Sequence, residues 1–223
     1  IIIFGGPNAS NLGERILKNH PEVDYVVYGD GEESLHGIVD KSSIIPNLWY
    51  RLNGKVLFTF KKNAPIKQTI PFDFEDLYET DIHKYDSRDE NYNENIGLTP
   101  VPISSIRGCF KAITVGACSY CAIPRFSKMN IINPELSWDQ IRLLNEKYGI
   151  NYFFETGDNF LSGNYHRRLL KSKPSDLKVH FRIYADFESL SPEEIDILKE
   201  LGVVEIFIGL ESISSDVVEK ANR

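Results

Sequence analysis

The sequence contains very little cysteine and methionine. Three of its 223 residues are cysteine, and Met129 is the single methionine. An odd number of cysteines argues against a framework of disulfides, and it suits a reducing compartment, where grouped cysteines more often bind metals or take part in catalysis. We therefore expect a cytoplasmic location. Because the chain opens on Ile1 inside an apolar run, we also expect it to be part of a longer protein.

Long apolar runs and a general excess of basic residues are missing as well. No stretch approaches the ~18 apolar residues that a membrane-spanning helix needs, so we predict no membrane association. The 25 Lys and Arg residues are outnumbered by 32 Asp and Glu residues, which gives a formal net charge of -7. A broad basic surface for nucleic acid is therefore not indicated. Residues 71–95 are rich in acids and are expected to form a solvated connector.

Near the start of the chain, apolar strands alternate with helical patterns. Residues 1–4 and 23–28 read as buried strands, followed by helices over 10–19 and up to Val39. This order predicts a parallel α/β sheet, in which ligands bind beyond the carboxyl ends of the strands. Glycines stand at both of these ends, where they either approach a ligand closely or only form tight turns: Gly5, Gly6, Gly29 and Gly31.

The rest of the chain begins with a hairpin and then repeats the strand–helix alternation. Asn53-Gly54 lies between two β-rich runs in 47–60 and predicts a tight hairpin. A strand over 102–106 leads into the cysteine region, and a helix over 134–148 has Ser137 as its expected N-cap. Polar residues follow each later strand, as in β/α barrels with active sites at that end. The later strands are expected over 152–154, 179–184 and 203–208, and the later helices over 167–172 and 191–201.

All three cysteines, Cys109, Cys118 and Cys121, lie within thirteen residues. A closed zinc site needs four ligands, and only the fold could bring His83 or His166 to this loop. Three unrelated thiols are a further alternative. Thiolates are soft ligands that suit iron–sulfur clusters, and three cysteines on four irons leave one iron open to a substrate or cofactor.

The segments Ser105-Ile106-Arg107-Gly108-Cys109 and Cys118-Ser119-Tyr120-Cys121 resemble the cysteine loop of the radical S-adenosylmethionine (SAM) enzymes. The resemblance is to the group that also contains a cobalamin-binding domain. That family commonly holds a [4Fe–4S] cluster on Cys-x3-Cys-x2-Cys after its first barrel strand. Here eight residues separate Cys109 from Cys118 instead of three. The ligand role of Cys109 is therefore the part of the resemblance most in need of a test.

The resemblance extends over nearly the whole chain. Residues 1–39 are similar to the last part of the cobalamin-binding domain of the family. Glu155-Thr156-Gly157-Asp158 stands where the family has its SAM amino-group motif, and Gly209-Leu210-Glu211-Ser212 stands where it has a SAM-ribose motif. The implied organisation has the C-terminal portion of a Rossmann-like cobalamin-binding domain at 1–45, a hairpin and acidic linker at 46–98, and a partial radical SAM β/α barrel at 99–223.

The resemblance also implies roles for individual residues. Each role has a structural alternative, since Tyr120 can pack under the loop, Asp158 can cap a helix, and Glu211 can pair with a surface base. Arg107 and Arg125 flank the loop and either neutralise the cluster, bind a carboxylate or form ordinary salt bridges. The resemblance implies that Cys109, Cys118 and Cys121 ligate the cluster. It implies that Tyr120 contacts the SAM adenine, that Asp158, beside Gly157, accepts a hydrogen bond from the SAM ammonium, and that Glu211 accepts from the ribose hydroxyls. It also implies cobalamin contacts at Gly5, Gly6, Gly29 and Gly31.

The function implied by the resemblance is that of a radical SAM enzyme. Its reduced cluster would cleave SAM to start radical chemistry, with cobalamin-dependent methyl transfer as one outcome and a one-electron donor such as flavodoxin or ferredoxin as a partner. A methylthiotransferase-like radical SAM enzyme is a neighbouring hypothesis. A non-catalytic iron–sulfur or zinc module that recruits a partner through its acidic connector is a hypothesis from another class. We expect residues 1–223 alone to be inactive.

Overall fold

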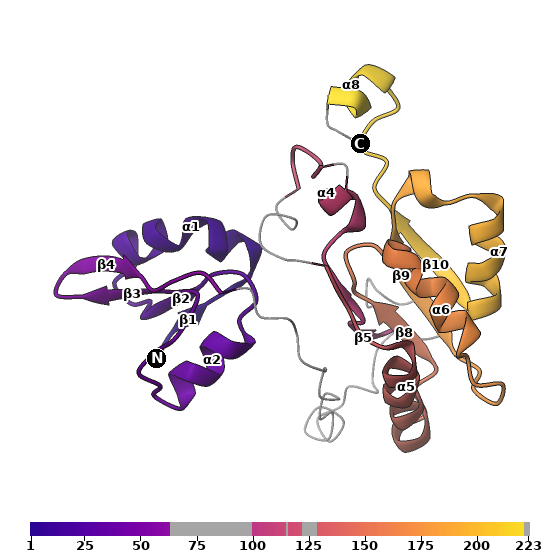
Figure 1. Ribbon diagram of the computed structural model, residues 1–223, viewed down its shortest axis with the longest axis horizontal. Coiled ribbons are helices and arrows are strands. Elements are labelled where there is room, and N and C mark those ends of the chain that lie inside the picture. Colours follow the sequence, from indigo (N-terminus) through magenta and orange to yellow (C-terminus); the bar gives the residue numbers. More distant parts are fainter. Residues whose placement is uncertain (63–99, 115, 122–128, 221–223) are drawn as a thin grey trace, which may run out of the picture.

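The computed structural model describes residues 1–62, 100–114, 116–121 and 129–220. The acidic connector at 71–95, His83 and Arg125 lie outside the described residues. The described chain forms two units, each built on its own sheet, which stand side by side in Figure 1. In the part of the chain that the structure describes, no helix has both the length and the apolar character required to cross a bilayer.

The N-terminal unit is a four-stranded mixed sheet with two helices, in the strand order β1-β2-β3-β4. β1 and β2 are parallel, whereas β2, β3 and β4 pair antiparallel. Asn53 and Gly54 have φ angles of 51° and 73°, which matches a tight two-residue turn and confirms the predicted hairpin. The hairpin therefore belongs to the same sheet as the first two strands. The elements are β1 (Ile3–Phe4), α1 (Gly6–Asn19), β2 (Tyr25–Val27), α2 (Glu32–Val39), β3 (Leu48–Leu52) and β4 (Lys55–Phe58).

Helix α1 begins at Gly6, four residues earlier than the sequence suggested. Pro7 lies in the first turn, where a residue without an N–H group removes no helical hydrogen bond. A Cβ atom at Gly13 would lie 2.3 Å from the Trp49 ring, so only glycine lets α1 pack this closely on the hairpin. The glycine turn after β1 thus passes directly into a helix that lies against the sheet.

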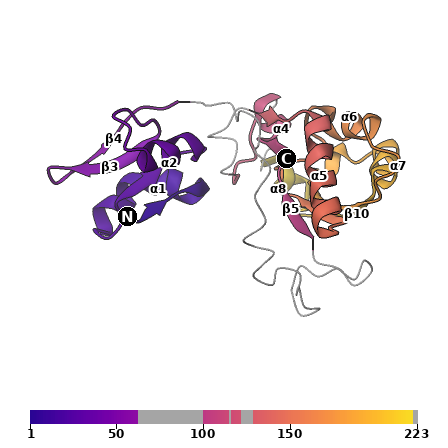
Figure 2. The same cartoon turned by 90° about the horizontal axis from the view of Figure 1, so that it is seen from below.

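The second unit is a four-stranded parallel sheet in the order β10-β9-β8-β5. Three helices pack beside the sheet in Figures 1 and 2, and this confirms the predicted α/β class with a parallel sheet. The strands are β5 (Val101–Ile103), β8 (Tyr152–Glu155), β9 (His180–Ala185) and β10 (Val203–Ile208), and the helices are α5 (Pro134–Tyr148), α6 (Tyr165–Lys171) and α7 (Pro192–Leu201).

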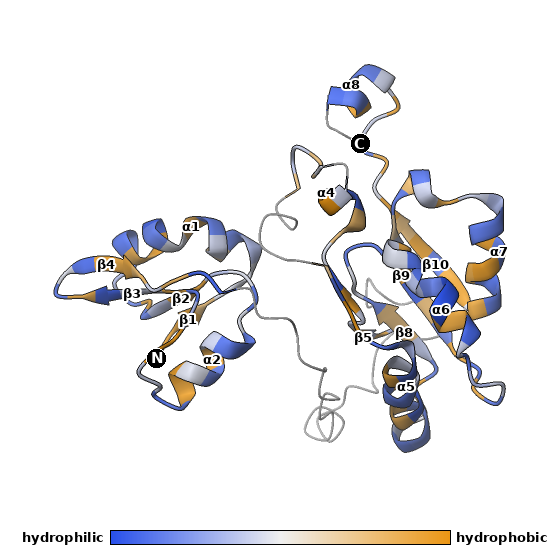
Figure 3. Cartoon of the chain, viewed as in Figure 1, coloured by the Kyte–Doolittle hydropathy of each residue, from blue (hydrophilic) through white to orange (hydrophobic). Residues whose placement is uncertain are grey.

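The main hydrophobic core includes alternate side chains of the central strands. Phe153, Phe181 and Ile183 are fully buried, together with Trp138 of α5 and Leu198 of α7. Figure 3 shows apolar strands beside helices whose outer faces are polar. Burial of such large side chains is the main stabilising contribution to this packing. The opposite side chains of the same strands remain available to line a site.

Local signals at the helix ends were partly misread. Ser191 caps α7 as expected, since its side chain accepts from the Glu194 N–H. The cap of α5 is Asn133, whose side chain accepts from the Glu135 N–H, so the prediction of Ser137 was wrong. Ser137 is buried inside the helix, where its hydroxyl lies 2.5 Å from the Tyr165 hydroxyl.

The predicted strand at 102–106 is not continuous, and it is interrupted where the main chain binds the carboxylate of Glu155. It divides into β5 and β6 (Ile106–Arg107), and β6 pairs antiparallel with β7 (Asn130–Ile131). Between them the Ser105 N–H donates to the buried Glu155 carboxylate, which draws the chain away from the parallel sheet. Shorter elements complete the described chain: α4 (Phe110–Thr114), η2 (Ser162–Asn164), η3 (Phe187–Ser189) and α8 (Ser215–Lys220).

Candidate functional site

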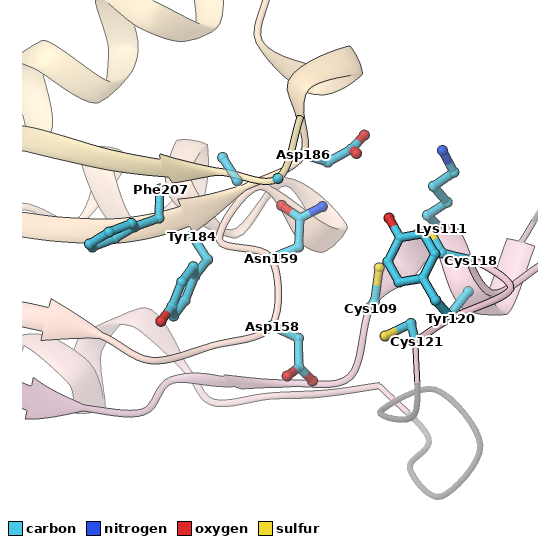
Figure 4. Close-up of a pocket in the computed structure, with 13 residues that line it drawn as sticks. Cys109, Lys111, Cys118, Tyr120, Cys121, Asp158, Asn159, Tyr184, Asp186 and Phe207 are labelled. Atoms are coloured by element: carbon cyan, nitrogen blue, oxygen red, sulfur yellow. The ribbon is translucent and has the colours of Figure 1, made fainter. Parts of the chain in front are cut away.

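The three cysteines line one cavity at the carboxyl ends of the parallel strands. This cysteine cavity has a volume of about 180 Å³, and all three cysteines are partly exposed and form no disulfide. In Figure 4 the cysteines occupy one side, Tyr184 and Phe207 the other, and Asp158 and Asn159 lie between them. The remaining lining residues are Lys111, Ala112, Tyr120, Ala185, Asp186 and Gly209.

Helix α4 accounts for the long spacing between the first two cysteines. It takes up five of the eight intervening residues as a short helix, and the Gly116 N–H then donates to the Lys111 carbonyl. The Cys121 N–H donates to the Cys118 carbonyl at 3.0 Å, which closes a turn around the second pair. The extra residues are thus compacted, and Cys109 reaches the same cavity as the other two cysteines.

The donor set suits a cluster better than a single metal ion. Among the described residues, no three His, Cys, Asp or Glu side chains converge on one position for an ion. Thiolates are soft ligands that suit an iron–sulfur cluster, and the cysteine cavity provides three of them. His166, one histidine that could have completed a zinc site, lies in α6 beside Glu194 and does not line the cavity.

Asp158 anchors the cysteine loop. Its Oδ2 accepts from the Gly108 N–H at 2.6 Å, directly before Cys109. Burial raises the pKa of Asp158, while the Gly108 N–H and the positive charge of Arg107 oppose that rise. One carboxylate oxygen of Asp158 thus holds the loop in place. The expectation that Asp158 binds a ligand's ammonium group remains a prediction.

The buried carboxyl group of Glu155 binds the main chain next to the site. This role of Glu155 was not predicted from the sequence. Its side chain accepts from the N–H groups of Ser105 and Gly157, at 2.9 to 3.0 Å. Burial raises the pKa of Glu155 to about 7 despite these bonds. A Cβ atom at Gly157 would lie 2.9 Å from that of Ile106, so glycine is required here for close packing. An acid that ends an otherwise apolar strand was the available signal.

Tyr120 and Glu211, both predicted to contact SAM, are placed differently. Tyr120 lines the cysteine cavity with half of its surface exposed, and Figure 4 shows it among the cysteines. Glu211 is exposed, has a φ angle of 57° and is not among the residues that line the cavity. The structure therefore brings Tyr120 to the site but not Glu211, and both roles remain predictions.

An aromatic wall formed by Tyr184 and Phe207 faces the thiols and was not predicted. The two ring centroids lie 5.5 Å apart, and Phe154 packs against both rings. Behind them lies the buried guanidinium of Arg182, which is bonded to Glu205 at 2.9 Å. These side chains share one face of neighbouring strands, and two of them, Tyr184 and Phe207, give the cavity an aromatic side.

A second cavity, the interdomain cavity, has a volume of about 420 Å³ and lies between the two units. Three of the four predicted glycines, Gly6, Gly29 and Gly31, line it, whereas Gly5 does not. Gly6 and Gly29 have φ angles of 89° and 70°, which favour glycine. Asp158 lies in the wall of both cavities. The other lining residues are Pro7, Ser10, Asp30, Glu32, Ser104, Ile106, Arg107 and Thr156.

Ser10 joins the two glycine turns of the N-terminal unit. Its hydroxyl donates to the Gly6 carbonyl at 2.9 Å and accepts from the Gly29 N–H at 2.8 Å. The carboxyl ends of β1 and β2 are therefore held side by side by one helical side chain. Sequence reasoning missed this residue because a serine in a helix has no distinctive spacing.

A parallel β/α sheet with a cysteine cavity at its strand ends is typical of cofactor-dependent α/β enzymes. Residues 103–223 match the family model of the radical SAM superfamily. This match covers more than half of the chain. The chain therefore belongs to the radical SAM superfamily, as its cysteine loop predicted.

One curated protein is similar to nearly the whole chain. An uncharacterized methyltransferase of Pyrococcus horikoshii is 25% identical over 230 residues, which cover 98% of this chain and 47% of the relative. The chain thus spans about half the length of that curated relative.

Two solved structures share the fold. The radical SAM methyltransferase TsrM of Kitasatospora setae, solved with cobalamin and a [4Fe–4S] cluster, has a TM-score of 0.68 at 18% identity, over 97% of this chain and 42% of its own. The cobalamin-dependent SAM radical enzyme OxsB, solved with aqua-cobalamin and SAM, has a TM-score of 0.70 at 16% identity, over 99% of this chain and 32% of its own.

Proposed function

We propose that this chain is part of a cobalamin-dependent radical SAM methyltransferase. In this proposal a [4Fe–4S] cluster and SAM occupy the cysteine cavity, and cobalamin occupies the interdomain cavity. One observation carries the proposal. Despite their unusual spacing, all three cysteines line a single cavity, and Asp158 joins that cavity to a second one lined by glycine turns. Two adjoining sites are what a reaction between two bound cofactors requires.

The protein's own residues would hold and orient the cofactors. Cys109, Cys118 and Cys121 would each ligate one iron and leave the fourth iron to SAM. When bound, the cluster and SAM supply one-electron cleavage of a sulfonium carbon–sulfur bond. The Asp158 oxygen that does not bind the Gly108 N–H would accept from the SAM ammonium, as a charge-assisted bond. Tyr120 would lie along the adenine, beside the thiols that it accompanies in the cavity.

The aromatic wall would keep water away from the reacting atoms. Tyr184 and Phe207 present apolar rings opposite the thiols, and water near a radical would allow side reactions. The ribose contact of Glu211 belongs to the proposal with less support, because Glu211 lies outside the cavity.

Several features support cobalamin in the interdomain cavity. Gly6, Gly29 and Gly31 carry no side chain, so a large ligand can approach the main chain closely. The TsrM and OxsB structures compared above are both described with cobalamin. A cytoplasmic location and a flavodoxin- or ferredoxin-like electron donor complete the proposal.

The direct test is anaerobic reconstitution of the full-length protein with iron and sulfide. The proposal predicts about four irons per chain, release of 5′-deoxyadenosine on addition of SAM and reductant, and visible absorbance from retained cobalamin. Stoichiometric zinc without SAM cleavage would support a non-catalytic module instead. Cleavage with incorporation of a methylthio group, and without retained cobalamin, would identify the methylthiotransferase-like alternative.

A further inference from the structure

Arg107 makes two ion pairs from the cysteine-bearing unit to the N-terminal unit. Its Nη1 lies 3.3 Å from the Asp30 Oδ1, and its Nη2 lies 2.6 Å from the Glu32 Oε1. The Arg107 and Asp30 side chains are partly buried, at 35% and 30% exposure, whereas the Glu32 side chain is more exposed, at 57%. The sequence left open whether this arginine neutralises a cluster or forms salt bridges, and the structure shows salt bridges. We call these three residues the interdomain clasp.

The carboxylates of the clasp stand on a well-supported turn. Asp30 follows Gly29, whose N–H is bound by Ser10 of α1. Glu32 is the first residue of α2, where the helix dipole favours a negative charge. Displacement of this turn would break its connection to the other glycine turn, so the N-terminal half of the clasp cannot move by itself.

The arginine half is equally well connected to the cysteine loop. Arg107 pairs with Asn130 in the short β6–β7 sheet, and its neighbour Ile106 is fully buried. The next residue, Gly108, donates its N–H to Asp158 and precedes Cys109. A shift of Arg107 would therefore pass directly to the first cysteine.

The charges of the clasp stabilise one another in place. Burial by itself disfavours both charged forms, but the Arg107 hydrogen bond and charge lower the pKa of Glu32 below its ordinary value. In the same way, the bonds and charges of Glu32 and Asp30 outweigh burial and raise the pKa of Arg107. A partly buried pair with a bidentate-capable arginine fixes orientation better than an exposed pair does.

We propose that Arg107 is a positioning residue that couples the two cavities. Through Asp30 and Glu32 it ties the glycine turn of the interdomain cavity to the loop that carries Cys109. A ligand that fills the interdomain cavity then restrains the cysteine loop, and the occupied loop strengthens binding of that ligand, because such coupling is reciprocal. The identities of both ligands rest on the proposed function, whereas the clasp itself is a property of the polypeptide.

The experiment measures amide hydrogen exchange in residues 106–110 of the full-length reconstituted protein, with and without hydroxocobalamin. In the wild type we expect cobalamin to slow exchange at the Gly108 amide. Arg107→Gln should raise exchange there about tenfold, abolish the cobalamin effect and weaken cobalamin binding about tenfold. Arg142→Gln, which removes a surface arginine paired with Asp176, is the matched control and should change none of these.

Rescue separates positioning from a general loss of structure. The exchanged pair Glu32→Arg with Arg107→Glu restores opposite charges and should recover most of the protection at Gly108, as should Arg107→Lys in part. The EPR line shape of the reduced cluster should follow the same order among the variants. If Arg107→Gln behaves like Arg142→Gln, the inference is wrong. If the wild type holds no cluster and no cobalamin, the proposed function fails instead, and exchange at Gly108 without ligand still tests the clasp.

Discussion

The cysteine cavity and the interdomain cavity share Asp158 but are held together in different ways. The cysteine cavity is lined by one unit. Its loops are held by the side-chain carboxylates of Asp158 and Glu155, which accept hydrogen bonds from main-chain N–H groups. The interdomain cavity has walls from both units, which meet across ion pairs of Arg107. The first cavity therefore depends on the interior of one parallel sheet, whereas the second depends on how two sheets are joined. Substitutions away from Asp158 and Arg107 should therefore act mainly on one cavity and reach the other only through the interdomain clasp.

The largest effect is expected from Cys109→Ala. Loss of this thiolate should abolish the cluster and with it SAM cleavage, because the structure brings Cys109 into the same cavity as Cys118 and Cys121. Iron analysis after reconstitution measures the outcome, with Ser119→Ala as the control. Cobalamin absorbance should persist, since the interdomain cavity lacks cysteines. A variant that keeps about four irons and cleaves SAM would exclude Cys109 as a ligand.

The next largest effect is expected on the free energy of unfolding, which should depend on pH through the titration of Glu155. Its folded pKa is about 7, against an ordinary value of 4.5. Between these pH values the unfolded chain releases a proton that the folded chain keeps, so the free energy of unfolding should fall by up to about 3 kcal/mol as pH rises. Below pH 4.5 and above pH 7 this contribution should be flat.

Urea denaturation of the cluster-free protein from pH 4 to pH 8 measures this slope. Glu155→Gln keeps an oxygen for the Ser105 and Gly157 N–H groups but cannot titrate, so the fall should disappear. Glu193→Gln, at an exposed site, should retain it. An unchanged slope in Glu155→Gln would mean that another group is responsible.

Asp158→Asn tests the residue that both cavities share. Asparagine keeps an oxygen for the Gly108 N–H but loses the negative charge, so the loop should stay in place. We expect SAM to bind about 10- to 100-fold more weakly, because a hydrogen bond to a charged group is lost. Equilibrium dialysis with labelled SAM gives this value, and iron content should not change. Equal SAM affinity in wild type and variant would remove Asp158 from the SAM site.

Ser10→Ala should give the smallest effect and should be confined to the interdomain cavity. The Gly29 N–H would lose its acceptor, at a cost of about 1–2 kcal/mol. Cobalamin titration should show roughly tenfold weaker binding, whereas iron content and SAM affinity measured without cobalamin should match the wild type. Ser172→Ala removes a hydroxyl at the end of α6, which donates to the Arg168 carbonyl, and serves as the control. A loss of iron in Ser10→Ala would contradict the separation of the two cavities.

Much of the fold was predictable because its signals are local. Apolar runs followed by glycine turns and helices predicted the parallel sheet, Asn53-Gly54 predicted the hairpin, and Ser191 predicted the start of α7. The cap of α5 was missed although Asn133 before Pro134 is also a local signal, and Ser137 is bonded instead to Tyr165, 28 residues away.

The candidate site was predictable only in part, because many of its contacts join residues that lie far apart in the sequence. The grouping of the cysteines in the sequence predicted a cofactor or metal site, and the position of Asp158 after a strand predicted that it lies at this site. The contact of Glu155 with Ser105 spans 50 residues, and the pairing of Arg107 with Asp30 spans 77. Tyr184 and Phe207 share a face only through the register of β9 and β10. Such long-range contacts follow from tertiary packing, which a single sequence does not display.

The most direct test of the central claim is the EPR spectrum of the reduced full-length protein, recorded before and after addition of SAM. If three cysteines hold a cluster with one open iron in the cysteine cavity, SAM should shift the g-values of the cluster, and Asp158→Asn should need a higher SAM concentration for the same shift. A cluster spectrum that SAM leaves unchanged at saturating concentration would contradict the account.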